Sequence, residues 1–409
     1  MAVLLKEEYE YELPEMFPVR QIFKDEALQD IEGSVLQELG KKEISEKLRP
    51  GMKVAVAVGS RGIANIFTIV KNCVDFLIEK GCKPYIISAM GSHGGGTEEG
   101  QRQVLAEYGV SEENLSVPVI TTVDTILCGH RENGTPVYFD RAASEADLII
   151  PINRIKLHTD FDGPLQSGLC KMLVIGLGNQ KGCSIMHETE PEEFATGLED
   201  AAGLILSKMP VGFGIAVMEN AYDHTCLIEA IPGEKIIERE RELVKDCASL
   251  MPFIRIEEAD VLIVDEIGKE ISGAGYDPNI LGRSSMLKAR RLHVPKFKRM
   301  ILLDVTKKSH GNAIGIGQFD FVTKNVVDSM DKETVYVNAL AVKCPEDARI
   351  PVIARDRDEA VRMALHCCRD IDKKNPRILE IKNTAELDII RLSGAYEEEV
   401  ENNPYLQKL

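Results

Sequence analysis

The sequence predicts an α/β protein with two α/β domains and a cleft between them, the first domain holding a mostly parallel sheet with helices on both faces. Two observations support this fold class. Short apolar segments alternate with segments whose apolar residues recur every three to four positions, as expected for strands that alternate with amphipathic helices. The chain has 409 residues, 44% of them hydrophobic, which is enough for more than one buried core.

The first strand–helix units lie near the N-terminus. We predict a buried strand at 53–58 and an amphipathic helix at 65–80, followed by Gly81, where a helix end favours a left-handed residue. A second strand at 84–90 leads into a glycine-rich loop, and a helix follows at about 97–108. Strands and helices in this alternating order indicate parallel pairing with helices packed on the sheet.

Further segments continue the pattern toward the C-terminus. The remaining predicted strands are 146–152, 211–219, 259–268, 299–306 and 350–354, and the remaining predicted helices lie near 323–341 and 357–371. We place a cofactor-binding domain at 1–272, with 374–409 packing back on it, and a second domain at 273–373. The glycine-rich stretch 268–282 is the predicted hinge.

Charge and composition exclude several classes of function. The net charge of −17 disfavours nucleic acid as a partner, and we interpret the basic run from Lys288 to Lys298 as a solvated surface. The ten cysteines show no CxxC spacing, which indicates reduced thiols and a cytoplasmic protein. The sequence contains neither the apolar core of a signal peptide nor an apolar run that could span a membrane. We therefore expect a small molecule as the substrate, and no membrane partner.

Three unusual segments follow predicted strands. They are GSRG (59–62), GSHGGGTEEG (91–100) and NRIKLHTDFDG (153–163). The carboxyl ends of parallel strands meet at one edge of a sheet, which is where such sheets bind ligands. If the strands are neighbours, Arg61, His93 and His158 should lie along one rim.

Each of these features also has an ordinary interpretation. The glycine-rich loop is either a flexible connection or a set of backbone amides that binds an anion at a helix N-terminus. The sequence lacks the P-loop, GxGxxG and GxSxG patterns of nucleotide-binding proteins and serine hydrolases. Lys171 opens an apolar segment, where an unused buried lysine is costly, and His187 follows it in GCSIMHETEPEE.

At these residues the sequence resembles the lactate racemase family, whose enzymes use a nickel-pincer nucleotide. The resemblance runs over roughly residues 50–285. It rests on a succession of elements: the arginine-bearing loop, AMGSHGGGTEEG, His158 in KLHTDFDGPLQSGLCKM, and His187 at a family-like distance after Lys171.

The resemblance implies a cofactor and a reaction. It implies that Ni(II)-pyridinium-3,5-bisthiocarboxylic acid mononucleotide is covalently attached to Lys171 and that His187 completes the square-planar nickel site. His93 and His158 then act as general acid and base on the substrate hydroxyl. The implied activity is that of an isomerase, a racemase or epimerase of an α-hydroxy acid that removes a hydride and returns it. Cofactor-synthesis proteins are implied partners, and the oligomeric state stays open.

The resemblance also assigns the surroundings of the reacting groups. Ser60 and Arg61 match the loop beside the cofactor, and Arg61 matches the arginine near the substrate carboxylate. The loop lacks the acidic residue and threonine usual there, and the stretch 159–170 is longer than in lactate racemase itself.

The second domain departs further from the family pattern. The glutamine and lysine that lactate racemase places on its substrate are not evident, and GAGYDPNILGRSS offers Asn279 and Arg283 instead. An added positive charge at Arg283 would suit a dicarboxylate or a sugar acid. The segment 309–321, with His310, Asn312 and Gln318, either faces the cleft or forms a turn.

Two other functions remain compatible with the sequence. One is a metal-dependent hydrolase or lyase in which His93, His158 and His187 hold a redox-inert ion. The other is a non-catalytic relative that binds the nickel nucleotide without turnover.

Overall fold

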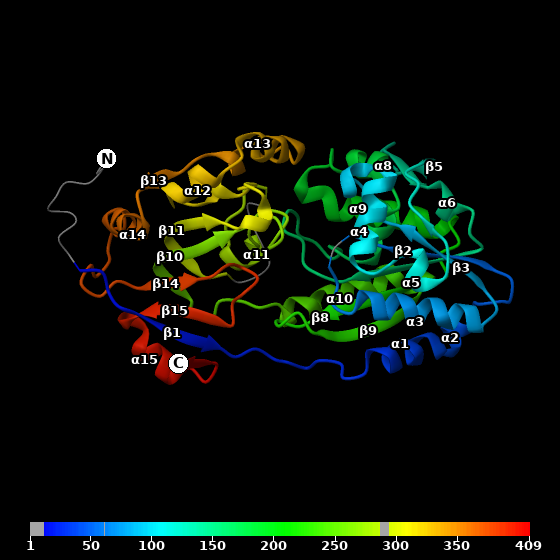
Figure 1. Ribbon diagram of the computed structural model, residues 1–409, viewed down its shortest axis with the longest axis horizontal. Coiled ribbons are helices and arrows are strands. Elements are labelled where there is room, and N and C mark those ends of the chain that lie inside the picture. Colours follow the sequence, from blue (N-terminus) through cyan, green and yellow to red (C-terminus); the bar gives the residue numbers. More distant parts are fainter. Residues whose placement is uncertain (1–11, 61, 287–293) are drawn as a thin grey trace. The chain divides into compact units, whose positions relative to one another are not determined.

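The computed structural model describes residues 12–60, 62–286 and 294–409, and the chain divides into two compact units (Figure 1). The first unit is Lys24–Met251. The second unit is Pro252–Leu409, joined by the N-terminal segment that ends at Phe23. Each unit holds its own sheet, and most strand pairs in both sheets are parallel, so the predicted α/β class is confirmed.

The first unit is built on a six-stranded sheet. Its strands, in spatial order, are β4 (Val119–Ile120), β3 (Lys83–Ser88), β2 (Lys53–Val58), β7 (Leu148–Arg154), β8 (Phe213–Glu219) and β9 (Thr225–Pro232). All neighbouring pairs are parallel except β8 with β9. A separate antiparallel hairpin consists of β5 (Thr125–His130) and β6 (Pro136–Asp140).

The order of these strands creates a topological switch point between β2 and β7. From β2 the chain moves outward to β3 and β4, and it returns to the centre as β7 before it continues to β8. Connections on the two sides of this point leave the sheet in opposite directions. In open parallel sheets, ligands bind beyond the carboxyl ends of the strands at such a point, which here lies between β2 and β7.

Helices cover both faces of the first sheet. One face packs against α1 (Ile31–Gly40), α3 (Ile66–Glu79) and α4 (Glu98–Glu107), and α1 lies beside α3 (Figure 1). The other face packs against α7 (Leu169–Lys171) and α10 (Ile236–Leu250), and α9 (Pro191–Lys208) packs on these two helices. The short helices α2 (Lys42–Ser45), α5 (Glu112–Leu115), α6 (Arg141–Ser144) and α8 (Asn179–Met186) complete the unit.

The strand β2 shows how the sequence specifies this arrangement. Its valines, Val54, Val56 and Val58, face α1 and α3 in one apolar core, and all three are fully buried. Each such side chain contributes about 1.5–3 kcal/mol on burial. The alternating alanines, Ala55 and Ala57, are also fully buried and belong to the other face of the strand. Small residues there let the chain after β7 pack close to the sheet.

The second unit is built on an eight-stranded sheet. Its strands, in spatial order, are β13 (Val352–Ala354), β12 (Phe321–Thr323), β11 (Lys296–Val305), β10 (Glu258–Ile267), β14 (Ile378–Ile381), β15 (Ile389–Ser393), β1 (Met16–Gln21) and β16 (Leu406–Lys408). The pairs from β13 to β14 are parallel, and the others are antiparallel. Its helices are α11 (Pro278–Leu281), α12 (Lys324–Ser329), α13 (Lys332–Ala341), α14 (Arg357–His366) and α15 (Glu397–Asn402).

The chain divides elsewhere than at the predicted boundary of 272/273. The segment 374–409 does not return to the first unit, because β14 pairs with β10 and β15 pairs with β1, all within the second unit. The predicted hinge at 268–282 likewise lies inside the second unit. Pairings such as Phe17 with Leu392 join segments from opposite ends of the chain, so local patterns do not report them.

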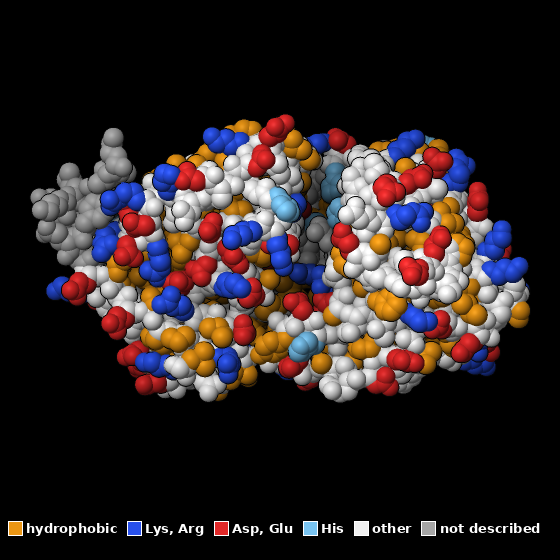
Figure 2. Space-filling model, in the orientation of Figure 1, with side chains coloured by type: hydrophobic (Ala, Val, Ile, Leu, Met, Phe, Trp, Pro, Cys, Tyr) orange, Lys and Arg blue, Asp and Glu red, His pale blue; other side chains and the backbone are white. Residues whose placement is uncertain are grey.

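The surface carries many charged side chains of both signs. Acidic and basic side chains are interspersed over the face shown in Figure 2. Many form local pairs, such as Lys71 with Asp75 at 2.7 Å. Within the basic run, Lys298 pairs with Asp260 at 3.0 Å, whereas residues 287–293 lie outside the described residues. Among the helices that the structure describes, none is both long and apolar enough to cross a membrane. None of the ten cysteines forms a disulfide.

Candidate active site

Three loops leave the first sheet at the same level. Val58 at the end of β2 pairs with Ser88 at the end of β3 and with Ile152 near the end of β7. The segments that begin at residues 59, 89 and 153 therefore start side by side at the carboxyl edge, flanking the switch point. This register brings the loops of Ser60, His93 and His158 to one rim, as expected if the strands are neighbours.

Ser60 and His93 are joined directly. The Ser60 hydroxyl and the Nδ1 atom of His93 form a short hydrogen bond. The Ser60 carbonyl in turn accepts a hydrogen bond from the Tyr108 hydroxyl at 2.8 Å, which holds the end of β2 to the end of α4. Because Nδ1 is engaged by Ser60, the ring orientation of His93 is set by the strand next to its own.

The loop that carries His93 is fixed from below by a buried side chain. Gln101 on α4 is fully buried and accepts a hydrogen bond from Ser88 at 2.6 Å. Its amide donates to the carbonyl oxygens of Gly91 at 3.2 Å and His93 at 3.5 Å. Gly94 has φ +64°, and a Cβ there would lie 2.7 Å from the Gln101 nitrogen, so no side chain fits. Gly94 thus allows the loop to pack closely on the start of α4.

The N-terminus of α4 has a side-chain cap from the protein itself. The Thr97 hydroxyl accepts a hydrogen bond from the Gly100 amide at 3.2 Å, as a helix N-cap does. Glu98 and Glu99 occupy the first turn and complement the helix dipole. This arrangement disfavours a phosphate at the helix start, one of the two interpretations of the glycine-rich loop.

His158 is held by hydrogen bonds to its backbone and to its ring. Its backbone amide donates to the Gln166 side chain at 2.6 Å, and Gln166 also donates to Asp162 at 3.1 Å. Its Nδ1 atom accepts a hydrogen bond from the Asp160 amide at 3.0 Å. Neutral His158 therefore carries its proton on Nε2, because Nδ1 must be unprotonated to accept this bond.

A stack of aromatic rings links His158 to His187. His158 stacks on Phe161 with ring centroids 4.2 Å apart, and Phe161 stacks on Phe194 at 4.4 Å. Phe194 then contacts the His187 ring at 5.6 Å. Both phenylalanines are buried, whereas His158 is half-buried and His187 is exposed. The stack provides a rigid apolar support between the two imidazoles.

His187 ends a helix whose start is anchored in the interior. It caps α8, and α8 begins at Asn179, a fully buried residue with φ +51°. The Asn179 amide donates to buried Asp140 at 2.7 Å. Burial raises the pKa of Asp140 to about 6, against the hydrogen bonds from Ala143 and Asn179, which lower it. An imidazole at a helix C-terminus is favourably placed for positive charge.

Lys171 lies on the last residue of α7 and is half-buried. A π-helical turn, Met172–Gly176, follows immediately. Such turns are rare and often occur at functional sites. The Asn153 amide donates to the Gly168 carbonyl at 2.7 Å, and a Cβ on Gly59 would lie 3.1 Å from the Met172 methyl group. The segment that carries Lys171 therefore packs on the ends of β7 and β2, beside the switch point.

None of the predicted substrate residues lies in the described part of the first unit. Arg61 lies outside the described residues, and Asn279 and Arg283 belong to the second unit. Arg283 donates to the Gln318 carbonyl at 2.8 Å and pairs with Asp320 at 2.9 Å. Its charge is thus compensated within its own unit, so it gives no argument for a second substrate carboxylate.

The segment 309–321 is tied into the second unit. The Asn312 side chain accepts the Ile314 amide at 3.3 Å, and the Gln318 side chain donates to Asp347 at 2.9 Å. His310 has φ +48° and ends a 3-10 turn. These bonds agree with the turn interpretation of the segment.

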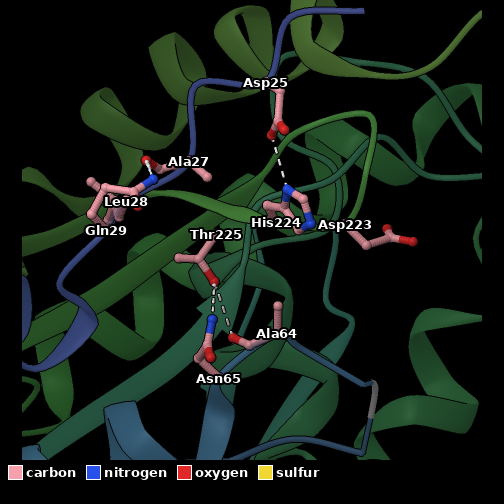
Figure 3. A pocket seen from close by; sticks show the side chains of 9 residues that line it. All are labelled: Asp25, Ala27, Leu28, Gln29, Ala64, Asn65, Asp223, His224 and Thr225. Carbon is pink, nitrogen blue, oxygen red and sulfur yellow. Dashed lines mark hydrogen bonds and ion pairs between the residues drawn. The ribbon is translucent and has the colours of Figure 1, made fainter.

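A cavity of about 510 Å³ lies elsewhere in the first unit (Figure 3). In it, Asp25 bonds to His224 at 2.9 Å and to Asn220 at 2.8 Å, and the Asn65 amide donates to Thr225 at 3.0 Å. The hydrogen bond from His224 is the first cause, and that from Asn220 the second, of a lowered pKa at Asp25. None of the predicted site residues lines this cavity.

We searched the described residues for side chains that could share a metal ion. Within the described ranges, no three His, Cys, Asp or Glu residues come together in a way that could hold a metal ion. His93, His158 and His187 therefore do not form a shared site, which goes against the hydrolase alternative. A nickel site that takes a single protein imidazole does not require such a cluster.

Comparison with known proteins identifies the family. A model of the lactate racemase N-terminal domain matches residues 5–196. Residues 5–196 belong to the lactate racemase N-terminal domain family. The matched region contains Ser60, His93, His158, Lys171 and His187.

Solved structures share the fold of this chain. The lactate racemase apoprotein of Thermoanaerobacterium thermosaccharolyticum has a TM-score of 0.55 and 12% identity, over 91% of this chain and 99% of that one. A protein of Thermotoga maritima has a TM-score of 0.51 and 16% identity, over 90% of this chain and 99% of that one. These likenesses concern the fold. A comparison with curated proteins finds no match.

Several residues that shape this site were not singled out from the sequence. Glu240 lies in the charged segment IIERERELVKD, where a glutamate looks solvent-exposed, yet it is fully buried. The spacing contained a signal, because Ile236, Glu240, Leu243 and Val244 form one helical stripe. Gln101 and Asp140 had no such signal, because their partners lie on other segments of the chain.

Proposed function

We propose that this chain is a racemase or epimerase of an α-hydroxy acid that uses the nickel-pincer nucleotide. The observation that supports this most is the arrangement at one edge of the first sheet. Ser60 and His93 are hydrogen-bonded there, His158 is linked to His187 by stacked rings, and Lys171 lies on the segment between them. Ser60, His93 and His158 lie on segments that follow β2, β3 and β7 beside the switch point, where an α/β sheet binds its ligand, and Lys171 lies on a segment that packs on the ends of β2 and β7.

The residues present fit the cofactor. Lys171 offers a primary amine on a segment packed against the ends of β2 and β7, suited to a covalent attachment. His187 offers an exposed imidazole at the end of α8, suited to nickel. When bound, the nucleotide would supply a group that accepts a hydride from the α-carbon and returns it.

The protein's own side chains would move the hydroxyl proton. As a hydride leaves the α-carbon, a neutral imidazole takes the proton of the hydroxyl, and a planar 2-oxo acid forms. Return of the hydride to the other face, with a proton from an imidazolium, gives the opposite configuration. His93 and His158 supply these two groups, because an imidazole ring can both accept and donate a proton in general acid/base catalysis.

The two histidines are not equivalent in their hydrogen bonding. His93 bonds through Nδ1 to a hydroxyl, which can donate or accept, so either tautomer is possible. His158 bonds through Nδ1 to a backbone amide, which only donates. For His158 to take a proton on Nε2, it must shift its neutral proton to Nδ1 and release the Asp160 amide. We expect this loop to rearrange when substrate binds.

The substrate carboxylate is assigned by family resemblance to Arg61. The charge of Arg283 is compensated by Asp320, so we favour a monocarboxylic acid over a dicarboxylate. Retained activity toward dicarboxylates, with little toward monocarboxylates, would contradict this assignment.

A substrate screen tests the proposal. Protein co-expressed with the cofactor-synthesis proteins is incubated with a panel of 2-hydroxy acids, and the loss of optical rotation is followed. His93→Ala and His158→Ala should each abolish interconversion and retain nickel, whereas His187→Ala should lose nickel. His224→Ala serves as the matched control, because His224 lies in the separate cavity. Turnover that survives either acid/base substitution would remove that histidine from the reaction.

A further inference from the structure

Glu240 is a buried carboxylate inside the first unit. It lies on α10, is fully buried, and occupies the helix face formed by Ile236, Leu243 and Val244. A carboxylate is costly to bury without compensating bonds. We therefore looked for the groups that compensate the buried carboxylate of Glu240.

The carboxylate of Glu240 meets the start of the helix that carries Lys171. Its Oε2 atom accepts the backbone amide of Cys170 at 2.9 Å, the residue directly before Lys171. Burial raises the pKa of Glu240 to about 7, and interactions with the backbone of Cys170 and Leu169 and with the Cys170 side chain lower it against this effect. The other carboxylate oxygen, Oε1, is buried and has no hydrogen-bond partner in the part of the chain that the structure describes. The first amides of a helix have no partner within the helix, and an anion stabilises this end.

Gly168 makes room for this contact. A Cβ at position 168 would overlap the Glu240 carboxylate, so a side chain there would displace it. The Gly168 carbonyl accepts the Asn153 amide at 2.7 Å. The backbone before Lys171 is thus held on one side by α10 and on the other by the end of β7.

We propose that Glu240 is a positioning residue that fixes the backbone of residues 168–170 and thereby holds the Lys171 amine at the carboxyl edge of the sheet. This inference rests on the proposed function in one respect: the role of Lys171 in holding the cofactor. The contact itself can be tested in protein without cofactor. Glu240 touches neither substrate nor cofactor in this account.

The first experiment uses the full-length protein expressed without cofactor synthesis. Hydrogen exchange reports the Cys170 amide, and acetic anhydride labelling with peptide mass spectrometry reports the Lys171 amine relative to exposed Lys181 in the same sample. In Glu240→Ala the loss of one hydrogen bond to a carboxylate should raise both rates about tenfold. Glu240→Gln keeps an oxygen acceptor but forms weaker bonds, so its rates should fall between those of wild type and Glu240→Ala.

Two further variants separate positioning from general loss of stability. Gly168→Ala attacks the same contact from the other side and should reproduce the Glu240→Ala result, and the double variant should add nothing to either single change. Glu359→Gln removes another buried carboxylate, in the second unit, and should leave the Lys171 to Lys181 ratio unchanged. If Glu240→Ala fails to fold, Glu240→Gln and Gly168→Ala still test the contact.

The second experiment uses cofactor-loaded protein. Glu240→Gln should lower the fraction of chains with an adduct on Lys171, and lower kcat about tenfold or more with little change in KM, because misplacing a reacting group affects the chemical step most. Unchanged labelling of Lys171 in every Glu240 and Gly168 variant would overturn the positioning role, whatever the activity. If the Glu240 variants show the labelling effect while cofactor-loaded wild type shows neither adduct nor turnover, the positioning role stands and the proposed function is refuted.

Discussion

Replacement of Phe194 by leucine tests whether the aromatic stack orients the nickel ligand. Phe194 is 4% exposed and lies between Phe161, at 4.4 Å, and His187, at 5.6 Å. Leucine keeps most of the apolar volume but removes both ring contacts. An aromatic pair contributes about 0.5–1.5 kcal/mol beyond its buried area, so losing the stack and leaving a small void should cost about 1–3 kcal/mol of unfolding free energy.

The informative comparison is with Phe213→Leu. Phe213 is fully buried at the start of β8, at the opposite end of the strand from the candidate site. Both variants should lose similar stability in urea unfolding. Only Phe194→Leu should also lower nickel retention and turnover, by about tenfold if roughly 1.4 kcal/mol of the ring contact is lost from the positioning of His187. Equal nickel retention in the two variants would refute the role of the stack.

Two further predictions concern the hydrogen bond between Ser60 and His93 and the buried carboxyl group of Asp140 that anchors the start of α8. Ser60→Ala removes the hydrogen bond to His93 and should lower kcat/KM about tenfold at unchanged nickel content. For a racemase, kcat/KM must fall by the same factor for both enantiomers, because the equilibrium constant between them is fixed at unity. An unchanged rate would show that Ser60 does not orient His93. The pKa of Asp140 is raised to about 6 by burial, so the folded state holds the proton more tightly than the unfolded chain, and stability should fall as pH rises from about 4 to about 7. Relative to Asp140→Asn, wild type should lose about 2 kcal/mol over that range in urea unfolding, and parallel pH profiles would contradict this.

The sequence predicted most of the first unit, because its signals are local. The apolar run in 53–58 and the helical spacing in 65–80 predicted β2 and α3 nearly to the residue. The order of strands and helices indicated parallel pairing, and the loops after β2, β3 and β7 were therefore expected at one rim. The register of Val58 with Ser88 and Ile152 places these loops there.

What the sequence did not predict depends on distant partners. The return of 374–409 to the sheet of β10 is specified by pairings such as Val261 with Ile378, between segments far apart in the chain. The compensation of Arg283 by Asp320 is of the same kind, because a positive charge in a sequence does not reveal its partner. Glu240 differs, since its place on the apolar stripe of α10 is visible once helical spacing is examined.

The proposed reaction depends on covalent attachment of the cofactor to Lys171, which intact mass spectrometry measures. Wild-type protein and a Lys171→Ala variant are each co-expressed with the cofactor-synthesis proteins and measured under denaturing conditions. We expect a nucleotide-sized mass increment on wild type, located by peptide mapping at Lys171, and none on the variant. A wild-type chain that racemises a 2-hydroxy acid while its polypeptide mass stays unmodified, or an increment at another lysine, would contradict it.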